Sequence, residues 1–442
     1  MDLQKNQIVK PTSEQVEWAD CEIGILVHYD LQIFCPGYEF GEKLGVYPEP
    51  SLFNPSMLNT DQWIQTAKAA GAKYAVLVAK HGTGFCLWPT EVHEYSVKYS
   101  PWKNGKGDIV REFIGSCSKF GIKPGLYYSV ADNAFFNINR GRVLSGNQEE
   151  QNRYNKIVIQ QLTELWSNYG ELFEIWFDGG VLNPREGGPD IEPLMKKFQP
   201  TANVFQGPHG TRSLLRWVGN EDGNAPYPCW STSFLKKNDY DGTENCPEAG
   251  KGDPSARIWA PAESDMPNRK RNMAYMNGWV WKEGEDGLVY PAEYLVERYF
   301  STVANNTNLL LGMVIDNRGL APTEDVKQFT RFGELMERIF DKSNLLAEKN
   351  GTGNELTVDI ESNNSIGYIV IMEDIEQGER ILKYKITGWD GTMWKDLCSG
   401  ISVGHKRIHC FTDNKPEKIS GIKFECIESK AEPVTRRLAV YK

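Results

Sequence analysis

The first 345 residues alternate between short apolar segments and segments with helical periodicity. The stretch YAVLVAKHG at 74–82 has the nearly continuous apolar character of a strand buried on both faces. A helical segment precedes it at 61–71, and another follows at 108–121, with Asp108 in the N-cap position and Gly121 at the end. This alternation is typical of a parallel sheet whose strands are connected by helices packed on its faces.

Further strand-like segments recur along this part of the chain. They lie at 24–30, 123–130, 172–180, 203–207, 215–221, 257–263 and 308–314. About eight strands in one α/β sheet favour closure into a barrel. Because the later half alternates less regularly, we expect a distorted (β/α)8-like TIM barrel over residues 1–345.

The end of the chain has a different pattern. After a helix-like segment at 323–342, short alternating strands with turn residues between them run to the C-terminus. This pattern predicts a C-terminal β-sandwich over residues 346–442.

Charge and hydropathy exclude several classes of partner. The chain has 49 basic and 59 acidic residues, so its formal net charge is −10. An acidic chain without a Lys/Arg block argues against a nucleic acid or an anionic membrane surface as partner. No run approaches the roughly 18 apolar residues of a membrane span, so we expect no membrane insertion.

Two carboxylates follow predicted strands. Asp178 ends the apolar run of IWFDGG, and Glu221, 43 residues later, lies in RWVGNEDG at the end of another strand-like run. Strand ends meet at one rim of an α/β barrel, where its chemistry takes place. Two carboxylates at that rim are the minimal apparatus for glycoside hydrolysis. Taken singly, each could instead cap a helix or lie on the surface.

Histidine and tryptophan supply candidate sugar contacts. His28 and His81 each end a predicted strand, and Trp176, Trp279 and Trp281 lie beside strand-end motifs. Imidazoles can bond hydroxyl groups, and indoles can stack on apolar sugar faces, although core packing is the simpler interpretation of any single tryptophan. A metal-dependent hydrolase is an alternative, but closely spaced histidines are absent, so we expect no metal. No nucleotide-binding motif occurs, and we expect no cofactor.

Several motifs together resemble a known family. AGAKYAVLVAKHGTGFCLWPTEVHEYSV, DIVREFIGSCSKFGIKPGLYYSV and EIWFDGG are similar to segments of the α-L-fucosidases of glycoside hydrolase family 29. The resemblance runs over roughly residues 15–345. RWVGNEDG most resembles the branch that acts on α-1,3- and α-1,4-linked fucose.

The resemblance implies a retaining exo-acting enzyme that removes terminal fucose from oligosaccharides or glycans. Asp178 matches the nucleophile of the family, and Glu221 matches the acid/base of that branch. The other matches are residues that contact the sugar: His28, His81, Tyr128, Trp176, Arg216, Trp279 and Trp281. Arg216 would lie close to the ring oxygen and the nucleophile.

One departure leaves the sugar open. Family members commonly have a second histidine where this chain has Gly82. A different α-L-sugar, such as L-galactose, is therefore an alternative substrate, and an inactive carbohydrate-binding relative is another alternative. Enzymes of this kind are usually exported, so we expect a periplasmic or secreted protein. No apolar signal segment stands at the start of the chain, so a cytoplasmic location also stays open.

Overall fold

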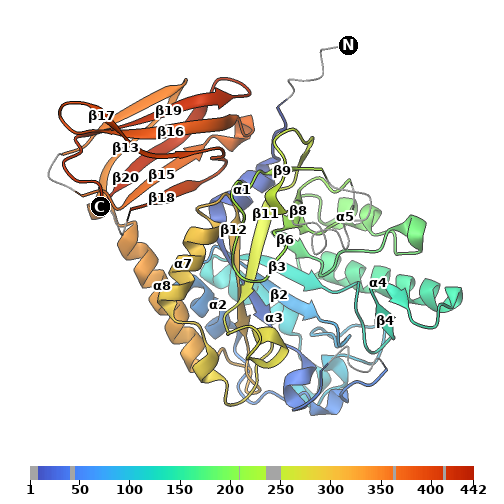
Figure 1. The fold of residues 1–442 in the computed structure, drawn as a ribbon. Helices are drawn as coiled ribbons and strands as arrows, with labels where there is room; N and C mark the ends of the chain where they lie inside the picture. The colour runs from blue at the N-terminus through green and yellow to red at the C-terminus, as the bar shows by residue number, and fades with distance from the viewer. Residues whose placement is uncertain (1–7, 40–44, 209, 235–249, 362–364, 412–414) are drawn as a thin grey trace, which may run out of the picture.

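The structure is a computed structural model that combines a closed eight-stranded parallel barrel with two four-stranded antiparallel sheets (Figure 1). This architecture confirms the predicted class, a TIM-like barrel followed by a β-sandwich. The described residues are 8–39, 45–208, 210–234, 250–361, 365–411 and 415–442.

The barrel strands are all parallel, and β1 pairs with both β2 and β12, which closes the sheet. In spatial order the strands are β1 (Ile23–His28), β12 (Asn308–Val314), β11 (Ala262–Pro267), β8 (Leu214–Trp217), β7 (Asn203–Phe205), β6 (Glu174–Trp176), β3 (Lys123–Tyr128) and β2 (Tyr74–Lys80).

Helices surround the barrel, and a polar side chain caps the N-terminus of each of the first four. They are α1 (Ser13–Cys21), α2 (Thr60–Ala69), α3 (Ile109–Phe120), α4 (Gln148–Asn168), α5 (Glu192–Phe198), α7 (Ala292–Thr302) and α8 (Thr323–Ile339). Asp108 accepts the Arg111 backbone N–H at the start of α3, and Gly121 ends that helix in the left-handed region at φ 70°.

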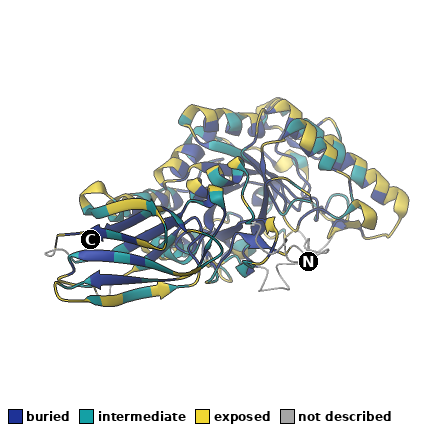
Figure 2. Ribbon diagram, turned by 90° about the horizontal axis from the view of Figure 1, so that it is seen from above, coloured by how far each residue is buried: buried dark blue, intermediate teal, exposed yellow. Residues whose placement is uncertain are grey.

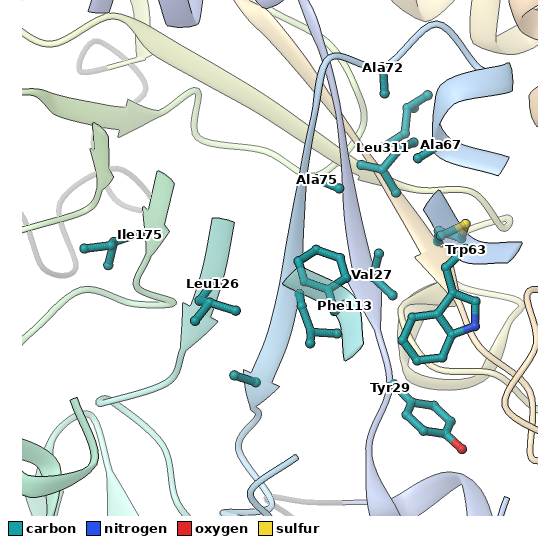
Figure 3. Packing of buried hydrophobic residues seen from close by; sticks show 14 of the residues in the cluster. Val27, Tyr29, Trp63, Ala67, Ala72, Ala75, Phe113, Leu126, Ile175 and Leu311 are labelled. Carbon is teal, nitrogen blue, oxygen red and sulfur yellow. The ribbon is translucent and has the colours of Figure 1, made fainter. Parts of the chain in front are cut away.

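Successive residues of each barrel strand face opposite sides of the sheet. On the outer face, Val27, Leu126 and Ile175 belong to the large cluster that includes Trp63 of α2 and Phe113 of α3 (Figure 3). The inner face of the barrel carries a smaller cluster that includes Leu26, Tyr127, Trp176, Phe205 and Leu215. Figure 2 shows the result, buried strands inside helices whose outer faces are exposed.

The later half of the barrel is irregular, as its sequence pattern predicts. Strands β6 and β7 have three residues each, and β8 has four. The connection from β8 to β11 contains a small antiparallel sheet of β9 (Thr232–Ser233) and β10 (Ile258–Trp259). A hairpin of β4 (Ile138–Asn139) and β5 (Arg142–Val143) follows β3.

The sandwich packs two sheets around an apolar core that includes Ile369, Ile386 and Phe424. One sheet has the order β13 (Leu345–Thr352), β20 (Val434–Tyr441), β15 (Tyr368–Glu373), β18 (Arg407–Cys410). The other has the order β14 (Glu355–Asp359), β19 (Gly421–Ser429), β16 (Ile381–Trp389), β17 (Trp394–Gly400). Helix α8 leads into it (Figure 1). Among the described helices, none has the length and apolar character needed to cross a bilayer.

Candidate active site

A cavity of about 1430 Å³ opens at the C-terminal ends of the barrel strands. Its inner part reaches the barrel interior at Leu26 and Phe205. Six of the residues singled out from the sequence line it: His28, His81, Trp176, Asp178, Glu221 and Trp279. Because parallel strands end at one rim, residues up to 251 positions apart in the chain meet in one hollow.

Asp178 lies two residues beyond the end of β6 and is exposed to this cavity. The phenol of Tyr127 donates a hydrogen bond of 2.7 Å to Asp178 Oδ2. Gly179 and Gly180 follow with φ angles of 64° and 73°, a conformation that favours glycine. The strand therefore ends in a tight turn that presents the carboxylate to the cavity.

Glu221 follows β8 on another part of the same wall and is half-buried. Arg271 Nη2 lies 3.1 Å from Glu221 Oε2, and Arg271 Nη1 donates to Asp222 at 2.8 Å. Beside Glu221, Asp265 accepts a 2.6 Å hydrogen bond from Trp217 Nε1. Burial and then the negative charge of Glu221 raise the pKa of Asp265 well above its usual range. This wall thus holds two carboxyl groups with different environments.

The two histidines lie side by side, with ring centroids 5.7 Å apart. Burial lowers the pKa of His28 well below its ordinary value, and burial followed by the charge of Lys80 lowers that of His81 to about 4. Both rings are therefore neutral at pH 7. Among the described residues, His28 Nε2 has no hydrogen-bond partner, which suits it to a ligand hydroxyl group.

Aromatic rings form a continuous wall beside Asp178. The ring of Trp176 stacks between those of Tyr127 and Phe205. The ring centroids of Trp176 and Tyr127 are 5.3 Å apart with an interplanar angle of 14°, and those of Trp176 and Phe205 are 4.1 Å apart with an angle of 5°. Across the cavity, Trp279 lies 4.9 Å from His28, and a Cβ added at Gly312 would come within 2.5 Å of its ring. Glycine at 312 thus makes room for this indole.

Within the described part of the chain, no cluster of three or more His, Cys, Asp or Glu side chains could hold a metal ion. The cavity lining presents carboxyl groups, imidazoles and aromatic rings.

The comparison with known proteins is decisive for the family. The α-L-fucosidase family model matches residues 7–339. The chain belongs to the α-L-fucosidase family, glycoside hydrolase family 29. α-L-Fucosidase 1 of Arabidopsis thaliana is 31% identical over 474 residues, covering 98% of this fucosidase and 87% of the plant protein.

Solved structures agree with this assignment. A Bacteroides thetaiotaomicron protein, for which α-L-fucosidase activity has been proposed, superposes with a TM-score of 0.92 at 35% identity, covering 99% of this chain and 100% of that one. A glycoside hydrolase 29 family member from a rumen bacterium superposes with a TM-score of 0.80 at 30% identity, covering 98% of this chain and 77% of that one. A Ruminococcus gnavus fucosidase solved with fucose shares the fold, with a TM-score of 0.80 at 22% identity, covering 100% and 96%.

Three residues singled out from the sequence do not line the cavity of this fucosidase. Tyr128 faces the outer side of β3, where its hydroxyl donates a 2.6 Å hydrogen bond to Gln161 of α4. The inward tyrosine is its neighbour Tyr127. Trp281 packs against the outer cluster, because the chain turns at Trp279 (φ −81°, ψ −19°).

The position of Arg216 contradicts the expectation that this residue lies near the nucleophile. Its neighbours Leu215 and Trp217 face the barrel interior, so the pleat directs Arg216 outward. There the buried guanidinium donates to the carbonyls of Trp230, at 2.7 Å, Gly250, at 3.1 Å, and Ala260. It joins both ends of the β8–β11 connection to the barrel wall.

Tyr127, Trp217, Asp265 and Arg271 also line or support the site, and the family resemblance assigned a role to none of them. Strand alternation could have identified Tyr127, because it pairs with Trp176 and so faces the same side. Arg271 lies in the connection after β11, where the sequence has no periodic pattern to place it.

Proposed function

We propose that this fucosidase is a retaining exo-enzyme that releases terminal α-L-fucosyl residues, with Asp178 as nucleophile and Glu221 as acid/base. The observation that carries the proposal is that these two carboxyl groups line one cavity. The inner end of the cavity is closed by side chains of the barrel interior, Leu26 and Phe205, which suits a terminal sugar.

The reaction follows from the two roles. Asp178 attacks the anomeric carbon while Glu221 gives its proton to the departing glycosidic oxygen, which forms a glycosyl ester and frees the aglycone. Glu221 then takes a proton from water, whose oxygen attacks the anomeric carbon and restores Asp178. Both transition states carry positive charge on the sugar, which the carboxylate of Asp178 stabilises.

The remaining cavity residues recognise the sugar in this proposal. His28 and His81 exchange hydrogen bonds with the ring hydroxyl groups, since both imidazoles are neutral and can accept as well as donate. The indoles of Trp176 and Trp279 surround the 6-deoxy methyl group. An apolar pocket of this kind favours a methyl over a hydroxymethyl by about 1–3 kcal/mol.

Retention is the property to test first. The anomer released from 4-nitrophenyl α-L-fucoside, followed by proton NMR before mutarotation, should be the α form. A 2-fluoro fucosyl donor should leave an ester on Asp178 that peptide mass spectrometry locates. Asp178→Asn should lower kcat by several orders of magnitude, and first release of the β anomer would overturn the mechanism.

For the linkage, we propose α-1,3- and α-1,4-linked fucose. The support is the RWVGNEDG segment around Glu221, which resembles the branch with that specificity. Branched trisaccharides with α-1,3- or α-1,4-linked fucose should be hydrolysed faster than an α-1,2-linked trisaccharide. Equal rates on all three would refute the narrow specificity.

L-Galactosides are a second substrate class to include. Gly82 offers no side chain where relatives have a histidine, so one hydroxyl contact is lost and discrimination at the sugar is relaxed. Aryl α-L-galactoside and aryl α-L-fucoside, compared by kcat/KM, measure the preference directly.

We also propose that the enzyme works in the periplasm or outside the cell, because oligosaccharides and glycans of this size do not cross a membrane unaided. Fractionation of cells that express the native gene, with activity measured in each fraction, tests the location. Activity confined to the cytoplasmic fraction would refute it.

A further inference from the structure

Two glutamates lie together inside the barrel, beneath the sugar cavity. Glu174 on β6 and Glu263 on β11 both have side chains on the inner face, and both residues have 0% of their surface exposed. Neither lines the cavity, and the proposed reaction uses neither. Burial of two carboxyl groups in one apolar interior is costly unless each is hydrogen-bonded.

Glu263 is bonded on both oxygens. Its Oε1 accepts a 2.6 Å hydrogen bond from the hydroxyl of Tyr74, and its Oε2 accepts one of 2.9 Å from the indole N–H of Trp176. Glu174 Oε2 accepts from the indole N–H of Trp18 at 3.2 Å. Trp18 belongs to α1, which packs at the N-terminal end of the barrel.

Above about pH 7 the pair holds one proton between its two members. Burial raises the pKa of both carboxyl groups, and a hydrogen bond from Glu174 to Glu263 favours the proton on Glu174. Glu263 is then the charged member, because it accepts from Tyr74, Trp176 and Glu174. A charged acceptor holds an indole N–H more strongly than a neutral one.

Trp176 in turn supports the catalytic wall. Its ring stacks on Tyr127, and the hydroxyl of Tyr127 donates to Asp178. Two hydrogen bonds and one stacked ring pair therefore connect Glu263 to the proposed nucleophile. An apolar side chain could fill the place of Glu263, but it would offer no acceptor to the indole.

We propose that Glu263 is a positioning residue for the fucose subsite: it fixes the Trp176 indole through its N–H, while Glu174 keeps the buried pair at a single negative charge. The inference rests on the proposed function in one respect, that the sugar binds against Trp176. It adds a role for two residues that never touch the substrate.

A double-mutant cycle tests whether Glu263 acts through Trp176. Glu263→Gln replaces the charged acceptor by a neutral amide, and Trp176→Phe removes the N–H donor but keeps a ring. We expect Glu263→Gln to weaken fucose binding, measured by calorimetry, about tenfold. In the Trp176→Phe background the same change should cost less than twofold, because the bond it weakens is already absent.

Glu174→Gln is the matched control within the pair. Its amide N–H can donate to Glu263 as the protonated carboxyl does, so we expect fucose affinity within about twofold of wild type. The wild-type pair should lose its remaining proton at alkaline pH and bind fucose more weakly as two charges repel. Glu174→Gln should abolish this alkaline loss. The other polar groups that face the pair are those of Tyr74, Trp18, Trp176 and Asp265.

The indole signal of Trp176 gives a readout independent of activity. In protein labelled with 15N-indole tryptophan, the signal absent from Trp176→Phe should shift in Glu263→Gln. In wild type it should move with pH at the same midpoint as the alkaline loss of binding, which keeps the test decisive if Glu263→Gln does not fold.

Several results would overturn the proposal. One is additive effects in the cycle, and another is an unchanged indole signal in folded Glu263→Gln. A third is a Glu263→Gln variant that has a lower Tm but whose folded fraction binds fucose with wild-type affinity. Wild-type protein that neither binds nor releases fucose would instead refute the sugar site itself. The indole shift alone would then decide whether Glu263 fixes Trp176.

Discussion

The hydroxyl group of Tyr127 and the carboxylate of Asp178 are joined by a hydrogen bond of 2.7 Å. The two residues come from adjacent strands, β3 and β6, and Tyr127 is fully buried behind the carboxylate. Burial and the negative charge of Asp178 raise the pKa of Tyr127 well above its usual range. The phenol therefore stays protonated at neutral pH and donates to the carboxylate, which holds the carboxylate in one orientation.

Tyr127→Phe should therefore lower kcat/KM about 10- to 100-fold, the range expected for losing a hydrogen bond to a charged group. The loss should fall mainly on kcat, because the bond orients the nucleophile. Tyr128→Phe is the matched control, since Tyr128 bonds Gln161 outside the barrel. Its kcat/KM should stay within about twofold, and equal losses in the two variants would contradict the assignment of faces.

The contrast between these neighbouring tyrosines shows what the sequence can and cannot determine. The barrel, the sandwich and the cavity positions of Asp178, Glu221, His28 and His81 follow from strand ends that converge at one rim. Which of two consecutive residues faces inward depends on the pairing of each strand. Strand β2 has an irregularity between Val78 and Lys80, opposite Tyr127 and Tyr128, and no sequence pattern marks it.

The interior glutamates were beyond sequence analysis for another reason. Glu263 ends a strand-like segment, and such a position predicts a residue at the rim, like Glu221. In the structure β11 pairs with the N-terminal part of β12, and Glu263 lies opposite Asn308, the first residue of that strand. The stagger of the barrel therefore places Glu263 near its base, and stagger is a property of the closed sheet.

Arg271 should be required to orient Glu221, because its guanidinium contacts both Glu221 and Asp222. Arg271→Gln should lower kcat/KM about tenfold on an oligosaccharide, whose leaving oxygen needs a proton, on the scale of one hydrogen bond to a charged group. A nitrophenyl leaving group departs without a proton, so with that substrate kcat/KM should change less than threefold. A plot of log kcat/KM against leaving-group pKa should become steeper, and an unchanged slope would refute the role.

Fucose binding should weaken at acid pH as His81 gains a proton. Its pKa is lowered to about 4 by burial, so the neutral ring persists from pH 7 down to about 5. Below pH 4 the proton occupies the nitrogen that would accept a sugar hydroxyl. The apparent association constant, measured by calorimetry, should then fall about tenfold per pH unit, and this fall due to His81 should be absent above pH 5.

His93 provides the control for this pH dependence. Its pKa is also lowered to about 4 by burial, but its ring bonds Gln161 and the backbone of Tyr95, outside the cavity. His93→Gln should keep the acid fall in affinity. His81→Gln should bind fucose more weakly at pH 7 and show no further fall near pH 4. The same acid fall in His81→Gln would assign the effect to another group.

Arg216 should matter for stability and little for chemistry, in contrast to the expectation that it contacts the nucleophile. Its buried guanidinium donates hydrogen bonds to three backbone carbonyls. The carboxylate of Glu379, from the sandwich, lies nearby. It accepts hydrogen bonds from the backbone N–H of Ser231 at 3.0 Å and from the Ser231 hydroxyl at 2.6 Å. Arg216→Leu removes the guanidinium donor from those carbonyls, and the carbonyl of Gly250 keeps only the Cys229 thiol at 3.6 Å. Each buried carbonyl left unsatisfied costs about 1–3 kcal/mol.

We therefore expect Arg216→Leu to lower the free energy of unfolding, measured in urea, by about 3–5 kcal/mol. Arg216→Lys, which keeps the charge and up to three donors, should recover part of the loss. Per active site, counted by titration with a fluorinated fucosyl donor, kcat should stay within about threefold of wild type. If Arg216 instead stabilised the transition state, kcat per titrated site would fall by orders of magnitude while the protein stayed folded, and the outward orientation of its side chain would be wrong.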